Sequence, residues 1–339
     1  MLQRPRRNRA HAAMREIVAE THLAPAHLVY PMFVMEGHGV RHPIASLPGM
    51  ARLSIDLLVA EARTAYDLGI RAVALFPLIP ETQKDALATE STNAEGLLPR
   101  TVRALKQELP DLMVITDVAM DPYSSDGHDG LVRDGEIVND DTLPILAAMA
   151  ITQARAGADM VAPSDMMDGR VAAIRRALDG EGFTNVAICS YCTKYASAFY
   201  GPFRDALDSA PRHGDKKTYQ MDPRNAREAL REVALDEAEG ADWIMVKPGL
   251  PYLDIVRLVR EHTALPVAVY HVSGEFAMLK AAAQNGWLDY DKSLMECLVS
   301  FRRAGANLIF TYAALDAARL LGGWAARAQP RPVLSLESQ

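Results

Sequence analysis

Short apolar runs alternate along the chain with longer segments of helical character. The helix-forming segments include 54–68, 141–156, 169–180 and 223–239. The last of these follows Asp222 and opens with Pro223, which predicts an N-cap and a first helical residue. Continuous rather than alternating hydrophobicity is typical of parallel strands that are covered on both faces. The pattern therefore predicts buried strands at 28–34, 71–78, 112–120, 160–165, 185–191, 243–248, 267–273 and 308–312.

A glycine recurs where a helical segment meets an apolar run. It occurs at Gly69, Gly157, Gly240 and Gly305, in each case shortly before a predicted strand. Glycine is favoured just after the C-terminus of a helix because it adopts the left-handed conformation without strain. Four copies of the same helix–glycine–strand pattern indicate a repeated αβ unit rather than a meander of hairpins.

Eight strands that alternate with helices predict a (β/α)8 TIM barrel, an α/β fold. An open doubly wound sheet is the alternative, but no predicted strand is followed by Gly-x-Gly-x-x-Gly and there is no Walker A motif. We assign the barrel to residues 26–325, an extended arm to 1–25 and a C-terminal tail to 326–339. The length of 339 residues is compatible with one such barrel and its extensions.

Composition excludes some classes of binding partner and predicts the cellular compartment of the protein. The formal net charge of −7 argues against nucleic acid as the main partner, and no apolar run approaches the roughly 18 residues that a membrane span needs. Three cysteines are too few for a disulfide framework and are typical of a reducing compartment. No apolar signal region follows the arginine-rich start of the chain. We therefore expect a cytoplasmic protein.

Two lysines lie at or just beyond the carboxyl ends of consecutive predicted strands, where barrels of this kind build their active sites. Lys247 directly follows the apolar run 243–246, and Lys194 follows the run 185–191. A buried ammonium group beside a second one binds its proton less tightly, because burial and charge repulsion both disfavour the charged form. The neutral amine then forms Schiff bases with ketones. An ion pair between Lys247 and Asp117 is the structural alternative.

These lysines lead to three hypotheses about the function of the protein. One reactive lysine is typical of a class I aldolase, whereas two indicate that two carbonyl substrates are held at once. A catalytically silent barrel that serves in binding or assembly is the third hypothesis. It would be expected to have lost a lysine or Asp117, and the chain retains all three residues.

The connection 192–222 is far longer than an ordinary loop and is rich in aromatic, glycine and charged residues. Long loops in compact domains are often lids or binding loops, and we interpret this one as a lid. Its side chains suited to holding a substrate carboxylate are Arg204, Lys216, Lys217 and the amide of Gln220. The neutral hydroxyl groups of Ser273 and Tyr312, at the ends of later strands, are suited to a second carboxylate.

An oxygen-rich cluster follows the third predicted strand in the segment 117–130. In an extended chain Asp117 and Asp121 share one face, and Asp129 lies on the following loop. Such clusters suit Mg²⁺ or a monovalent cation, and a solvated turn without metal is the alternative.

Five motifs resemble the delta-aminolevulinic acid dehydratase family, and the likeness extends from about residue 4 to about residue 320. They are APSDMMDGR (162–170), KYASAFYGPFRDAL (194–207), YQMDP (219–223), MVKPGLPYLDIV (245–256) and VSGEFAM (272–278). The family condenses two molecules of 5-aminolevulinate to porphobilinogen, with release of two waters, in tetrapyrrole and haem biosynthesis. The resemblance agrees with the hypothesis of two lysines.

The resemblance implies roles for the candidate residues. Lys247 would form the Schiff base with the first substrate, and Lys194 would engage the second. The groups implied for the first carboxylate are Ser273 and Tyr312, and those for the second are Arg204, Lys216 and Gln220. The residues implied in orienting the second amine and in proton transfer are Asp117 and Ser164. The residues implied in the lid are Tyr200 and Phe203.

The resemblance also bears on metals and assembly. The zinc branch of the family has three cysteines where this chain has Ala119, Asp121 and Asp129, so we expect no zinc site. The pattern is similar to the magnesium-responsive bacterial branch, in which an allosteric Mg²⁺ outside the active site would be held by Glu232. The resemblance does not decide whether Asp121 and Asp129 hold a cation. The family forms homo-octamers, in some members alternating with hexamers, and the arm 1–25 would wrap a neighbouring barrel.

Overall fold

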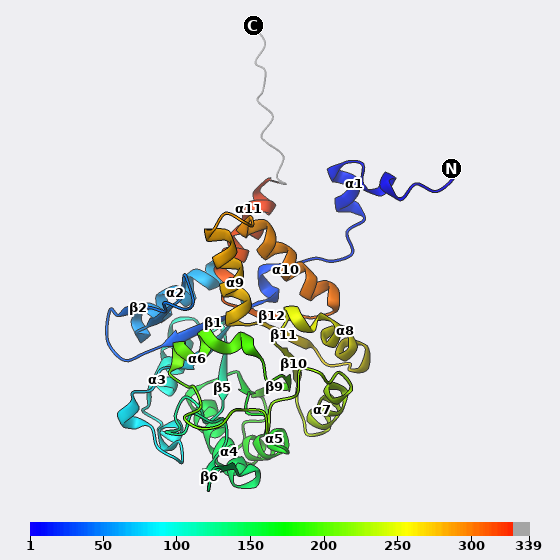
Figure 1. The fold of residues 1–339 in the computed structure, drawn as a ribbon. Helices are drawn as coiled ribbons and strands as arrows, with labels where there is room; N and C mark the ends of the chain where they lie inside the picture. The colour runs from blue at the N-terminus through cyan, green and yellow to red at the C-terminus, as the bar shows by residue number, and fades with distance from the viewer. Residues whose placement is uncertain (328–339) are drawn as a thin grey trace.

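The parallel strands of the computed structural model close into a barrel (Figure 1). The structure describes residues 1–327. Within them the barrel strands pair in chain order, and the last pairs with the first through Leu28 and Ile309, which removes any free edge. The eight strands are β1 (Leu28–Val34), β4 (Ala72–Pro77), β5 (Met113–Val118), β8 (Met160–Pro163), β9 (Ala187–Lys194), β10 (Trp243–Lys247), β11 (Val267–His271) and β12 (Leu308–Thr311). The predicted (β/α)8 barrel is confirmed.

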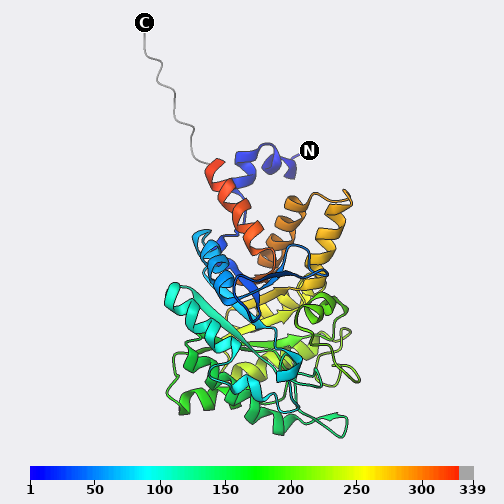
Figure 2. The same cartoon turned by 90° about the vertical axis from the view of Figure 1, so that its left-hand side faces the viewer.

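Helices surround the strands on the outside of the barrel (Figure 2). Gly157 and Gly305 adopt φ values of 104° and 120° at the ends of two of them, as the glycine pattern predicts. The helices that follow the strands in turn are α2 (Ile55–Asp67), α3 (Leu97–Glu108), α4 (Asn139–Ala156), α5 (Arg170–Gly180), α7 (Arg227–Ala238), α8 (Leu253–His262), α10 (Tyr290–Ala304) and α11 (Ala314–Arg327).

Additional elements decorate this framework. Helix α6 (Gly201–Leu207) belongs to the long connection after β9, and α9 (Ser273–Gln284) follows β11 directly. The short strands outside the barrel ring are β2 (Arg41–Pro43), β3 (Ala51–Leu53), β6 (Val132–Arg133) and β7 (Glu136–Ile137). The single-turn helices are η1 (Pro5–Arg9), η2 (Pro25–His27), η3 (Glu81–Gln83), η4 (Thr89–Thr92), η5 (Ala198–Tyr200) and η6 (Leu250–Tyr252).

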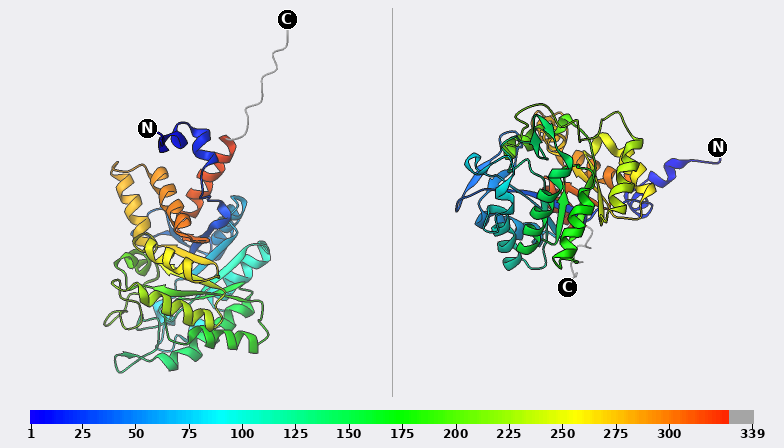
Figure 3. Two further views of the ribbon diagram at one scale, coloured as in Figure 1. Left: turned by 90° about the vertical axis from the view of Figure 1, so that its right-hand side faces the viewer. Right: turned by 90° about the horizontal axis from the view of Figure 1, so that it is seen from below.

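The N-terminal segment lies outside the barrel (Figures 1 and 3). Its helices η1 and α1 (Ala12–Ile17) contain no buried residue. This segment therefore contributes little to the core of its own chain. The predicted tail 326–339 lies almost entirely outside the described residues. None of the described helices is long and apolar enough to cross a membrane.

Two local predictions differ from the structure. Strand β9 continues through Lys194 instead of ending at residue 191, so the lid begins later than expected. Asp222 is not the N-cap of α7, because the helix starts at Arg227. The Asp222 carboxylate instead accepts hydrogen bonds from the backbone and side chain of Arg224, which closes a separate turn before the helix.

Candidate functional site

The two candidate lysines are neighbours in the barrel. Lys247 ends β10, Lys194 ends β9, and the two residues are direct partners in the parallel register. Paired residues of adjacent parallel strands project their side chains to the same side of the sheet. Each lysine is only 6% exposed. Sequence alone placed both at strand ends, and the pairing brings them to one mouth.

Aromatic side chains enclose the Lys247 ammonium group at ring-centre distances between 4.5 and 5.3 Å. Burial and then the charge of Lys194 lower the pKa of Lys247 to about 7, although nearby carboxylates oppose the shift. A substantial neutral fraction therefore exists near neutral pH. The four rings belong to Tyr191, Tyr200, Phe203 and Tyr270.

Sequence reasoning missed Tyr191 and Tyr270. Each is the aromatic residue of a fully or almost fully buried strand, β9 or β11, and an aromatic ring inside a predicted barrel strand was the signal available in the sequence. Tyr270 also forms a hydrogen bond of 3.2 Å with the hydroxyl group of Tyr312. The ring of Tyr312 in turn stacks on Phe33 at 5.8 Å.

Lys194 is held by groups from two neighbouring elements. Its ammonium group donates to the backbone carbonyl oxygen of Ser164, just after β8, and lies 3.5 Å from the Asp129 carboxylate. Ser164 therefore contacts Lys194 through its backbone carbonyl group and not through its hydroxyl group. The Ser164 hydroxyl group instead stabilises the charged form of Asp117.

Lys216 reaches from the lid into a buried pair of carboxylates. Its ammonium group lies 3.2 Å from Asp121 and 3.0 Å from Asp129. Burial alone would raise the pKa of Asp129, but the charges of Lys194 and Lys216 hold that pKa below its usual value. Burial would likewise lower the pKa of Lys216, yet the two carboxylates raise it. Two lysines and two aspartates thus form one compensated charge cluster.

The carboxyl group of Asp117 is buried beside the same cluster of lysines and aspartates. Burial, followed by the charge of Asp121, raises the pKa of Asp117 to about 7, against a hydrogen bond from Ser164 and the lysine charges. Its Oδ1 atom is buried and has no hydrogen-bond partner among the described residues. A carboxyl group in this state can accept or release a proton near neutral pH. The ion pair that was considered between Asp117 and Lys247 is not formed within the described chain.

The lid contacts the same mouth through α6. The backbone N–H of Phe203 donates to the Ser273 hydroxyl group at 3.0 Å, and the ring of Phe203 packs edge-on against Phe76 at 5.2 Å. The Tyr200 hydroxyl group donates to the carbonyl oxygen of Lys247 at 3.2 Å. Arg204 is half-buried on the same helix. Gln220, at the far end of the lid, is buried and its Oε1 atom has no partner in the part of the chain described.

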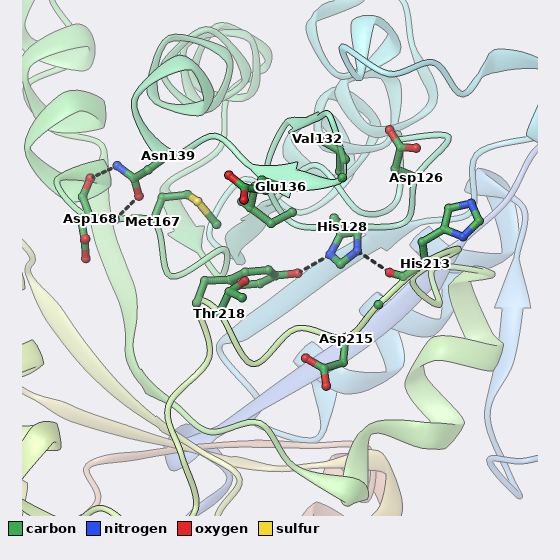
Figure 4. A pocket seen from close by; sticks show the side chains of 14 residues that line it. Asp126, His128, Val132, Glu136, Asn139, Met167, Asp168, His213, Asp215 and Thr218 are labelled. Carbon is green, nitrogen blue, oxygen red and sulfur yellow. Dashed lines mark hydrogen bonds between the residues drawn. The ribbon is translucent and has the colours of Figure 1, made fainter.

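Two cavities lie beside this mouth rather than in it. The larger one measures about 930 Å³ and is lined by the loop around His128, the hairpin β6–β7 and the lid residues 213–219 (Figure 4). The smaller one, about 290 Å³, is lined by polar residues that include Glu232, Glu228 and Asp168. Burial, then the charge of Asp236, raises the pKa of Glu232.

A profile of the family described as delta-aminolevulinic acid dehydratase matches residues 2–320. The chain belongs to this family. The dehydratase of Glycine max, named chloroplastic, is 57% identical over 323 residues that cover 95% of this chain and 78% of the relative. The chloroplastic dehydratase of Chlamydomonas reinhardtii is 56% identical over 334 residues, covering 94% of this chain and 85% of the relative.

A solved structure of the same family superposes closely. The delta-aminolevulinic acid dehydratase of Toxoplasma gondii, described in complex with the reaction product porphobilinogen, has a TM-score of 0.95 and 52% sequence identity. The match covers 98% of this chain and 96% of that chain. The family resemblance expected from the motifs is confirmed.

As a dehydratase of this family, the protein is a lyase of tetrapyrrole biosynthesis. It condenses two molecules of 5-aminolevulinate to porphobilinogen with release of two waters. This result excludes the single-lysine aldolase and the silent barrel. Members of the family use metal ions, bind 5-aminolevulinate and are typically oligomeric.

The location expected from the sequence needs a correction. The relatives from Glycine max, Arabidopsis thaliana, Chlamydomonas reinhardtii and Oryza sativa are all named chloroplastic. The prediction of a cytoplasmic location is therefore wrong by this comparison. Low cysteine content reports a reducing environment, and a reducing environment does not distinguish between compartments.

Proposed function

We propose that Lys247 and Lys194 each form a Schiff base with one 5-aminolevulinate molecule. The observation that carries the proposal is their pairing at the ends of β10 and β9, with a pKa for Lys247 of about 7. The neutral amine adds to the ketone carbon and water leaves, which gives an imine at each lysine. Each imine formed releases one of the two waters of the overall reaction.

Carbon–carbon bond formation follows from an enamine. Removal of a proton next to one imine gives an enamine carbon, which attacks the imine carbon of the other substrate. That second lysine then leaves as a free amine. The amino group of one substrate displaces the remaining lysine and closes the ring, and loss of a last proton makes the ring aromatic. Asp117, with a pKa of about 7 and an unpaired Oδ1 atom, is suited to these proton transfers.

We assign the carboxylates of the two substrates to different walls of the mouth. Ser273 and Tyr312 offer neutral hydroxyl groups at the ends of β11 and β12 for the first substrate. The lid supplies the second set, namely Arg204, Lys216 and Gln220. Ser164 would orient the second amine together with Asp117. Tyr200 and Phe203 would close the mouth over Lys247, whose ammonium group their rings already contact.

Trapping with borohydride tests the two lysines directly. The full-length protein is incubated with 5-aminolevulinate, reduced, digested and mapped by mass spectrometry. We expect a stable adduct on Lys247 at low substrate and on both Lys247 and Lys194 at saturation. Lys280, which is paired with Asp316 away from the mouth, serves as the internal control and should stay unmodified. Adducts on neither Lys247 nor Lys194 would overturn the assignment.

For the metal, we propose an allosteric Mg²⁺ at Glu232 and no zinc. Mg²⁺ keeps several waters and needs only one or two carboxylates, and the cavity that Glu232 lines is also lined by Glu228 and Asp168. Burial disfavours the Glu232 carboxylate in the free protein, and a cation would compensate that charge. Among the described residues no group of three or more His, Cys, Asp or Glu side chains converges as a metal site.

The carboxylates of Asp121 and Asp129 are the second place proposed for a cation. Both carboxylates contact the ammonium group of Lys216, so a monovalent cation there would compete with that lysine. We also propose a homo-octamer, with hexamers as an alternate assembly, in which the arm 1–25 packs on a neighbouring barrel. The exposure of Ile17 and of the other apolar residues of this arm supports that assembly.

A further inference from the structure

His128 ties two points of the lid to the body of the barrel (Figure 4). It lies in the loop after β5 and is almost fully buried. Its Nε2 atom is 2.8 Å from the carbonyl oxygen of His213, and its Nδ1 atom is 3.1 Å from the Tyr219 hydroxyl group. The two contacts lie at opposite ends of the lid segment 213–219.

The donors and acceptors of this arrangement fit one consistent network. The carbonyl oxygen of His213 can only accept, so Nε2 of His128 donates to it, and in that tautomer Nδ1 is the acceptor. The Tyr219 hydroxyl group then donates to Nδ1 and also accepts from the backbone N–H of Asp129 at 3.3 Å. Each of these atoms has a partner, and a satisfied network of this kind rigidifies the segments that it joins.

The same loop touches the lid at two further points. The backbone N–H of Arg212 donates to the carbonyl oxygen of Asp126 at 3.0 Å. Gly127, at φ +68°, approaches the lid so closely that a Cβ atom would lie 2.2 Å from the carbonyl oxygen of Ala210. A glycine is therefore required there by both conformation and space.

The segment held in this way carries Lys216. Its ammonium group reaches Asp121 and Asp129, and its carbonyl oxygen accepts from the backbone N–H of Gln220 at 2.9 Å. Fixing residues 213 and 219 therefore restricts Lys216 and Gln220, which face the second substrate in the proposed function. The first-substrate groups at Ser273 and Tyr312 lie on other elements.

We propose that His128 and Tyr219 form a clasp, defined as their mutual hydrogen bond and their bonds to His213 and Asp129. The clasp positions Lys216 and Gln220 for the carboxylate of the second 5-aminolevulinate. His128 and Tyr219 are positioning residues that touch no reacting atom. The inference rests on the proposed function only for the identity of the bound carboxylate, and the clasp itself is testable without turnover.

The first test uses the full-length enzyme and two single substitutions. Tyr219→Phe removes only the hydroxyl group, and His128→Gln keeps a donor for His213 but has no acceptor atom at the place of the imidazole Nδ1 that faces Tyr219. Tyr290→Phe is the matched control, because its hydroxyl group bonds Asp316 between α10 and α11, away from the mouth. Thermal unfolding of all three variants verifies that they fold.

Limited trypsin digestion tests the clasp directly, since Lys216 and Lys217 lie in the held segment 213–219 and Arg212 directly precedes it. Loss of one hydrogen bond that fixes a loop should increase cleavage there by about three- to tenfold in Tyr219→Phe and His128→Gln. Tyr290→Phe should be cleaved at the wild-type rate. Wild-type cleavage in both clasp variants would overturn the clasp.

Steady-state kinetics then test whether the clasp positions Lys216 and Gln220 for the substrate. We expect KM for 5-aminolevulinate to rise by about tenfold in both clasp variants, with kcat changed by less than about threefold and with unchanged borohydride trapping at Lys247. Faster cleavage with an unchanged KM would refute the positioning role. Failure of wild-type trapping at Lys247 would instead refute the proposed function and leave the cleavage result intact. In the double variant the effects should be less than additive, because both changes remove the same bond.

Discussion

At the scale of single residues, the chemistry depends on how an ammonium group is kept partly neutral. Lys247 is surrounded by four aromatic rings, which favour its charged form through cation–π attraction. Burial and the neighbouring Lys194 charge oppose the charged form and prevail, since the pKa falls to about 7. Lys194 thus acts on Lys247 through its charge, in addition to the bond to substrate that we propose for it.

Removing that charge should shift the pH dependence of trapping at Lys247. The neutral fraction of Lys247 rises as pH increases through its pKa of about 7. In Lys194→Met one cause of the lowered pKa is absent, so the midpoint should move to higher pH. Trapping at pH 7 should slow by about fivefold if the pKa rises by about one unit. The measurement is the rate of adduct formation at Lys247 against pH, with Lys280→Met as control. An unchanged midpoint would show that burial alone sets the pKa.

At the scale of elements, the site combines strand ends with one long connection. Strands β9 and β10 fix the lysines in register, whereas the lid brings Lys216, Arg204 and Gln220 from positions that have no strand or long helix to hold them. Helix α7 lies after the lid and carries Glu232, fifteen residues before Lys247 in the chain. A cation at Glu232 would therefore adjoin residues 217–222 of the lid, which line the same cavity.

The proposed magnesium site makes a specific prediction for α7. Activity should rise with added Mg²⁺, and Glu232→Gln should need at least about tenfold more Mg²⁺ for half-maximal stimulation, because a ligand charge is lost. Glu261→Gln, a change on the exposed face of α8, should respond as wild type does. Activity should also persist with 1,10-phenanthroline. Inhibition by this chelator that only zinc reverses would contradict the proposal, as would an unaltered response of Glu232→Gln.

At the scale of the whole molecule, the N-terminal segment lies outside the barrel of its own chain (Figures 1 and 3). Helices η1 and α1 bury no residue, and Ile17 is 81% exposed. Exposed apolar side chains that lie together mark surfaces which associate with another chain. In a family whose members are typically oligomeric, this exposure supports our proposal that the arm is the contact between copies.

Charges on the arm should weaken the assembly without unfolding the barrel. Ile17→Asp together with Val18→Asp should shift the protein from an octamer to smaller species in light scattering at equal concentration. Burying each such side chain contributes about 1.5–3 kcal/mol, so the association constant should fall by at least about tenfold at each contact. Glu20→Gln is the control on the same segment. An octamer that persists in the charged variant would exclude the arm as the contact.

Several elements were predictable because local physics decides them. Continuous apolar runs specify buried parallel strands, and glycines such as Gly157 and Gly305 end helices where φ must be positive. The end of β9 was misplaced because Cys192, Thr193 and Lys194 are buried in the strand, although the sequence after residue 191 becomes more polar. Asp222 was misread since an aspartate before proline suits both a helix cap and a turn.

The barrel, the family and the residue types of the chemistry could be predicted from the chain, because hydrophobic period, turn residues and motifs are local properties. The folded arrangement settled which groups meet. It paired Lys247 with Lys194 across two strands and placed Lys216 between Asp121 and Asp129. It also joined His128 to Tyr219 over 91 residues. Such contacts depend on strand register and loop path, which no local pattern of residues encodes.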